Sequence, residues 1–172
     1  SGAIPDGDTA IIGDDMTVSY NGVPASETIG SLTLGNNLDN QNLGQGRLRL
    51  TGGIFTIIND LNVGTSDGLN DAFLTVSGAA SLQIGGDAAF GADAHSADGS
   101  LFIEETAQVS ITGNLTMGGF DHGGSLLQVE LPGSLPALAV GGTMRLDRCA
   151  LDLSFASGYT HTPGTTFTLV TY

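Results

Sequence analysis

Apolar and polar residues alternate over short stretches that recur along the chain in a fixed order. Each stretch is an apolar–polar–apolar triplet, which is the period-2 pattern of a β-strand with one buried face. Three kinds of triplet follow one another, and each kind returns after about 27 residues. The first kind comprises Leu48-Arg49-Leu50, Leu74-Thr75-Val76, Leu101-Phe102-Ile103 and Leu127-Gln128-Val129. The second kind comprises Phe55-Thr56-Ile57, Leu82-Gln83-Ile84, Val109-Ser110-Ile111 and Leu138-Ala139-Val140. The third kind comprises Leu32-Thr33-Leu34, Leu61-Asn62-Val63, Ala88-Ala89-Phe90, Leu115-Thr116-Met117 and Met144-Arg145-Leu146.

Glycine, asparagine and aspartate separate the triplets, as expected where a chain turns sharply or adopts positive φ. The first four triplets of the third kind are each followed by a glycine, namely Gly35, Gly64, Gly91 and Gly118. Helical 3.6-residue periodicity is absent over any useful length. The pattern therefore predicts an all-β protein, a parallel β-helix (β-solenoid) with three short strands per coil of about 27 residues. The coil is expected to be right-handed, although the spacing alone does not determine its handedness.

A β-sandwich or barrel would also contain many short strands, but it would not require every third strand to resemble its predecessors. The chain is predicted to be one solenoid domain over residues 1–172. Residues 1–28 are expected to form an irregular N-terminal coil or cap, and residues 29–149 to form the repeats. Residues 150–172 are expected to form a C-terminal cap or an assembly end, because an uncapped solenoid exposes strand edges and core to another chain.

The core of the solenoid is predicted to contain a ladder of the last apolar residue of each triplet of the third kind. The members of this ladder are Leu34, Val63, Phe90, Met117 and Leu146. Together with their counterparts in the other two sheets, they would supply the cohesion of the rod.

The charge balance excludes some classes of partner. Eighteen acidic residues face four basic ones, all arginine, and the net charge is −14. Such a chain repels phosphate backbones and anionic lipid headgroups, so nucleic-acid binding and membrane binding are not expected. No apolar stretch approaches the ~20 residues that span a bilayer. The single cysteine, Cys149, has no partner for an internal disulfide and is expected to be a small buried side chain.

The loops that follow the third strand of each coil hold the densest polar cluster, and they are expected to stack along one edge of the rod. The aspartates of this cluster are Asp39, Asp67, Asp71, Asp93, Asp98 and Asp121. Stacked carboxylates and loop carbonyls would suit Ca²⁺, which prefers six to eight oxygen ligands. The alternative is that these aspartates only shape the turns through side-chain-to-backbone hydrogen bonds, with no cofactor bound.

His95 and His122 share one offset within the same loops, beside Asp98 and Asp121. Two histidines and a carboxylate are a ligand set for a transition metal, and the same edge would alternatively bind a carbohydrate. Solvated loop histidines without a ligand are the competing interpretation.

Enzymatic activity is not expected. A glycoside hydrolase needs two carboxylates at a defined separation, and Glu104 and Glu130, with Glu105 beside them, follow strands of the first kind. In so acidic a chain some pair of carboxylates will always suit such a mechanism, so the pair has little weight. Ice binding is not favoured either, because the outward positions of the predicted sheets show no regular threonine array.

Four segments carry a resemblance to a known group of proteins: residues 4–11 (IPDGDTAI), 30–35 (GSLTLG), 61–64 (LNVG) and 164–169 (GTTFTL). They resemble the repeat regions of secreted bacterial autotransporter passengers and of surface proteins with PEP-CTERM sorting signals. The resemblance implies export and a cell-surface or matrix role. Two hallmarks of these proteins, an outer-membrane barrel segment and a C-terminal sorting peptide, are not found in this sequence.

These observations lead to two functional hypotheses. The first is an extracellular structural or adhesive protein of a bacterial surface or matrix, which self-associates end to end into filaments or binds other matrix components. The second is a carbohydrate-binding or carbohydrate-active module that uses the Asp/His loop edge for a polysaccharide.

Overall fold

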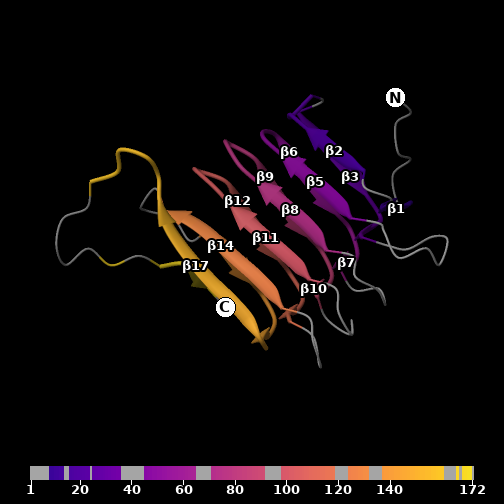
Figure 1. The fold of residues 1–172 in the computed structure, drawn as a ribbon. Coiled ribbons are helices and arrows are strands. Elements are labelled where there is room, and N and C mark those ends of the chain that lie inside the picture. The colour runs from indigo at the N-terminus through magenta and orange to yellow at the C-terminus, as the bar shows by residue number, and fades with distance from the viewer. Residues whose placement is uncertain are drawn as a thin grey trace.

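The computed structural model consists of β-strands joined by turns. It describes residues 8–13, 16–23, 25–35, 45–64, 71–91, 98–118, 124–131, 137–160, 166 and 168–171. This part of the chain contains no helix, and its strands form three parallel sheets of six strands each. Each sheet takes every third strand along the chain, so the prediction of a parallel β-solenoid with three strands per coil is confirmed (Figure 1).

The sheets are named here A, B and C. Sheet A contains, in order, β1 (Thr9–Ile12), β4 (Ser31–Leu34), β7 (Leu61–Val63), β10 (Ala88–Phe90), β13 (Leu115–Met117) and β16 (Met144–Leu146). Sheet B contains β2 (Thr17–Tyr20), β5 (Gly46–Leu50), β8 (Ala72–Val76), β11 (Gly99–Ile103), β14 (Ser125–Leu131) and β17 (Cys149–Phe155). Sheet C contains β3 (Ser26–Ile29), β6 (Ile54–Ile57), β9 (Ser81–Ile84), β12 (Gln108–Ile111), β15 (Leu138–Val140) and β18 (Val170–Thr171).

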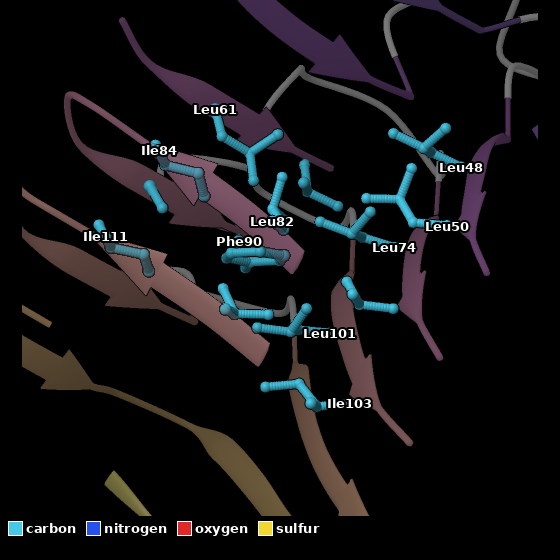
Figure 2. Close-up of a cluster of buried hydrophobic side chains, with 14 of the residues drawn as sticks. Leu48, Leu50, Leu61, Leu74, Leu82, Ile84, Phe90, Leu101, Ile103 and Ile111 are labelled. Carbon is cyan, nitrogen blue, oxygen red and sulfur yellow. The ribbon is translucent and has the colours of Figure 1, made fainter. Parts of the chain in front are cut away.

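The apolar positions of the triplets point inward and form one core between the three sheets. Side chains from all three sheets meet there, with Phe90 of sheet A among leucines and isoleucines of sheets B and C (Figure 2). The polar position of each triplet faces outward, because successive side chains of a strand alternate between its two faces. The hydrophobic effect over these stacked inward positions is the main source of stability.

The predicted core ladder runs in register along sheet A. Leu34 pairs with Val63, Val63 with Phe90, Phe90 with Met117, and Met117 with Leu146. The first four side chains are fully buried, whereas Leu146 lies at the edge of the sheet and is largely exposed. Leu146 therefore continues the register of the ladder without being a core residue, because no further coil of the described chain packs over it.

The two terminal segments contribute strands of their own. In the region 1–28, which was expected to form an irregular coil or cap, β1, β2 and the first three residues of β3 pair in parallel register with the next strand of each sheet. At the other end, β17 and β18 are also parallel to their neighbours, as in a further coil and unlike a hairpin. Both ends of the solenoid thus present parallel edge strands.

The glycines that follow the strands of sheet A have a conformational reason. Gly35, Gly64, Gly91 and Gly118 all have positive φ, between 61° and 98°. At Gly64 a Cβ atom would also lie 2.5 Å from the backbone oxygen of Asp98. The repeated glycine in the sequence therefore marks the corner at which the chain leaves sheet A.

Candidate functional site

The predicted loop edge lies mainly outside the described residues. This applies to Asp39, Asp67, Asp93, Asp121, His95 and His122. Asp71 and Asp98 are described, and they immediately precede β8 and β11, which pair in parallel, so the two aspartates lie on neighbouring coils. Within the described ranges, no group of three or more His, Cys, Asp or Glu side chains is placed to hold a metal ion.

Asp98 shows how such an aspartate shapes a turn. Its Oδ1 accepts a hydrogen bond from the backbone N–H of Gly124, at 2.5 Å, on the next coil. Its backbone oxygen accepts another from the N–H of Ala72, at 2.8 Å, on the previous coil. This aspartate therefore ties three successive coils together through its side chain and backbone.

Of the glutamates considered for hydrolysis, Glu104 and Glu105 follow β11 at a second corner of the coil, and Glu130 lies near the end of β14. Glu130 Oε2 accepts a hydrogen bond from the backbone N–H of Glu105, at 2.9 Å, and Glu105 has a φ of 58°. A carboxylate of Glu130 thus stabilises a turn in which a residue other than glycine adopts the left-handed conformation. Glu104 is half-buried on the outer side of sheet B.

A ladder of polar side chains between sheets C and A was not predicted from the sequence. Asp87 N–H donates to Asp60 Oδ1 at 2.9 Å, and Asn114 N–H and Nδ2 donate to Asp87 Oδ1 at 2.7 and 3.1 Å. Thr143 continues the ladder, since its N–H and Oγ1 donate to Asn114 Oδ1 at 2.9 and 2.8 Å. The ladder could have been found in the sequence from the spacing of these residues, which follows the repeat of about 27. The four residues of the ladder are exposed, and their hydrogen bonds join each turn to the corresponding turn of the adjacent coil.

The end of the solenoid formed by β16 and β17 is the feature most suited to binding another molecule. Four inward-facing apolar side chains are exposed there: Leu146 (44%), Leu151 (50%), Leu153 (44%) and Phe155 (47%). Their register partners one coil earlier are Met117, Leu127, Val129 and Leu131, which are 0–8% exposed. These four residues occupy positions of the repeat that are buried in the earlier coils, yet at this end they form an apolar surface.

The backbone of this end is equally open to pairing. β16 and β17 are the last strands of sheets A and B, and β17 is seven residues long. β17 lies at the outer edge of the solenoid (Figure 1). An edge strand presents a row of N–H and C=O groups that can pair with a strand of another chain. The end therefore combines exposed core side chains with hydrogen-bonding edges.

At the opposite end of the solenoid, formed by β1, β2 and β3, more of the inward-facing side chains are buried. On β1, β2 and β3 the inward residues Ile12, Tyr20 and Ile29 are buried, and the Tyr20 ring packs edge-on against Phe55 at a centroid distance of 5.5 Å. Three other inward positions are less covered: Val18 of β2 is 36% exposed, and Ala10 and Glu27 are half-buried. Their register partners Leu48, Leu32 and Phe55 are all buried. Burial, together with the charge of Glu27, raises the pKa of the Tyr20 phenol.

The thiol of Cys149 lies at the start of β17 and is half-buried. Burial raises the pKa of this thiol, and a hydrogen bond with the backbone of Leu127 opposes that shift. A raised pKa disfavours the thiolate, which is the nucleophilic form. The environment of Cys149 therefore suits a packing residue.

Comparisons with known proteins do not assign the chain to a family. No family model matches it, and neither the curated proteins nor the solved structures compared with it give a significant match. No helix long and apolar enough to cross a membrane occurs in the part of the chain that the structure describes.

Proposed function

We propose that this protein is an extracellular structural or adhesive component of a bacterial surface or matrix, and that it assembles end to end into filaments. The observation that carries the proposal is the apolar end of β16 and β17, where core positions of the repeat are exposed. The cellular location is proposed from the resemblance of the repeats to those of exported surface proteins. The proposed role is not catalytic.

A second copy of the same chain fits this end by its geometry. Its β1, β2 and β3 present parallel edges in the same sheet order as β16, β17 and β18. Docking β2 of one copy beside β17 of another would continue sheet B and bring Val18 close to the exposed leucines of β17. The two surfaces are different, so each copy keeps a free end and the contact propagates as an open filament.

The energetics favour weak, concentration-dependent association. Completing the burial of the four half-exposed side chains would contribute about 1 kcal/mol each, half of the value for a full transfer from water. Association itself costs about 4–15 kcal/mol in lost freedom of motion. The free energy from the apolar contact alone barely equals the lower limit of this association cost. Hydrogen bonding between the strand edges is therefore needed as well.

Electron microscopy tests this proposal. The account predicts unbranched filaments one solenoid wide, in which the six stacked strands of each described sheet account for about 29 Å of every copy at ~4.8 Å per strand. Compact particles at every concentration would contradict assembly. Antibody labelling of intact cells tests the location separately, and signal only after permeabilisation would contradict an extracellular role.

A further inference from the structure

The outer face of sheet B holds a hollow of about 380 Å³ near its N-terminal side, on β2, β5, β8 and β11. The residues that matter for its chemistry are Arg47, Arg49, Phe73, Thr75, Phe102 and Glu104. A volume of this size lies within the ~300–1,000 Å³ range of ligand sites. The hollow is separate from the exposed end of β16 and β17, and the inference does not rest on the proposed filament.

The register of the strands explains why these side chains meet. Arg47 lies opposite Phe73, Arg49 lies opposite Thr75, and Thr75 lies opposite Phe102. All are outward positions of their strands, so the pleat places them on one surface. The result is a continuous patch across three coils, built from residues that are far apart in the sequence.

The aromatic rings form a platform. Phe73 and Phe102 stack with centroids 6.4 Å apart and an interplanar angle of 30°, and both are half-buried. The Arg47 guanidinium lies 4.9 Å from the centroid of the Phe73 ring, within the range of a cation–π contact. The Phe73 ring of β8 thus lies between the Arg47 guanidinium of β5 and the Phe102 ring of β11.

The patch also concentrates the scarce positive charge of the protein. The chain has four basic residues, and two of them, Arg47 and Arg49, lie here two positions apart on one strand. Arg47 donates a hydrogen bond from Nη2 to Gln45 Oε1 at 2.7 Å. Arg49 is exposed and makes no hydrogen bond or ion pair within the described part of the chain, so its planar donor group is available to a carboxylate.

We propose that this patch binds a segment of an acidic polysaccharide. The carboxylate of a uronate residue would pair with Arg49, assisted by the charge of Arg47, and the C–H groups of a pyranose ring would pack against the exposed parts of Phe73 and Phe102. Thr75 and Glu104 supply hydrogen-bonding groups for sugar hydroxyls at the same place.

Other classes of ligand fit the patch less well. Nucleic acid needs several cations to neutralise its phosphates, and this patch has two within a chain of net charge −14. A neutral saccharide would leave the charge of Arg49 unused. At physiological salt the screening length is ~8 Å, so the distant acidic residues repel a bound uronate only weakly.

The test compares an oligogalacturonate with a neutral maltooligosaccharide of the same length, by isothermal titration calorimetry at physiological ionic strength. The variant is Arg49→Gln, and its matched control is Arg145→Gln. Arg145 is an outward residue of sheet A, paired with Asp147 at 2.9 Å, so both variants make the same change in net charge. A second variant, Phe102→Ser, removes one ring from the platform, and circular dichroism checks that each variant is folded.

The proposal predicts binding of the oligogalacturonate but not of the neutral saccharide, a loss of about tenfold or more in affinity for Arg49→Gln, and no change for Arg145→Gln. The loss follows from removing the charge-assisted hydrogen bonds between the Arg49 guanidinium and the uronate carboxylate. Equal binding of the two saccharides, no binding, or equal effects of the two arginine variants would overturn it. Loss of self-association in Arg49→Gln without saccharide binding would assign the patch to a contact between copies, and would also overturn it.

Discussion

The glycines after the strands of sheet A determine how the chain turns into the next loop. Gly64 is the clearest case, because its φ is +62° and any Cβ atom would meet the Asp98 carbonyl oxygen at 2.5 Å. Gly158, in contrast, has a φ of +83° but open space around its Cβ position. Substitutions at the two glycines can therefore distinguish the cost of the left-handed conformation from the cost of a steric clash.

Gly64→Ala is predicted to lower the free energy of unfolding by about 2–5 kcal/mol. The left-handed conformation costs about 1–2 kcal/mol for a residue with a Cβ atom, and crowding against fixed backbone adds about 1–3 kcal/mol. Gly158→Ala is the matched control and should cost only the conformational part. Urea denaturation of both variants measures the difference, and equal losses would contradict the assigned contact with Asp98.

The thiol of Cys149 is predicted to form its thiolate at higher pH in the folded chain than in the unfolded chain, because burial raises its pKa. The stabilising contribution is fully present below the unfolded pKa and is lost as pH rises through the folded pKa. Measuring the rate of thiol modification against pH, with the urea-unfolded chain as control, checks this. A reaction midpoint at or below that of the unfolded chain would contradict it.

At the scale of the strands, the triplets and their spacing were enough to predict the three-sheet solenoid and the register of the ladder from Leu34 to Met117. Both follow from a local pattern repeated at a constant period. The exposure of Leu146 could not be predicted in this way, because periodicity encodes register and says nothing of what packs over the last strand. The Arg47–Phe73–Phe102 patch escaped prediction for a different reason: its members occupy outward positions of the repeat, where the residue type changes from coil to coil, so their contacts follow only from the strand pairing.

The candidate sites could be predicted from the sequence less completely than the fold. The role of Asp98 depends on which backbone N–H lies above it on the next coil, and that is set by loop lengths. The polar ladder through Asp87 and Asn114 shows the same limit. Its members follow the period of the repeat, but their hydrogen bonds exist only once the coils are stacked.

Asn114→Ala is predicted to lower the free energy of unfolding by about 1–2 kcal/mol. The substitution removes the acceptor of two hydrogen bonds from Thr143 and the side-chain donor to Asp87, at about 0.5–1.5 kcal/mol each before discounting for solvent exposure. Asn62→Ala is the control, because Asn62 is an outward residue of sheet A for which the described structure shows no side-chain hydrogen bond. Its effect should stay within about 0.5 kcal/mol. Equal effects in thermal or urea unfolding would show that the ladder does not stabilise the stacking.

For the whole molecule, two opposing properties would control the proposed assembly. The exposed leucines and Phe155 of the β16–β17 end favour contact with another copy, whereas a net charge of −14 on every copy opposes it. Salt screens the repulsion and leaves the apolar contact intact. Association should therefore strengthen as ionic strength rises, the reverse of an assembly driven by ion pairs.

The most direct test is solution mass by multi-angle light scattering over a concentration series. It compares the unmodified chain with Leu153→Glu and with the control Leu126→Glu, an outward, half-buried position of sheet B that makes the same charge change. Parallel samples contain calcium or a chelator, so that a requirement for calcium would point to the Asp-rich loops. The account predicts a mass that grows with concentration for the unmodified chain and for Leu126→Glu, and a monomer for Leu153→Glu. A concentration-independent monomer of the unmodified chain, or growth of Leu153→Glu equal to that of the control, would contradict it.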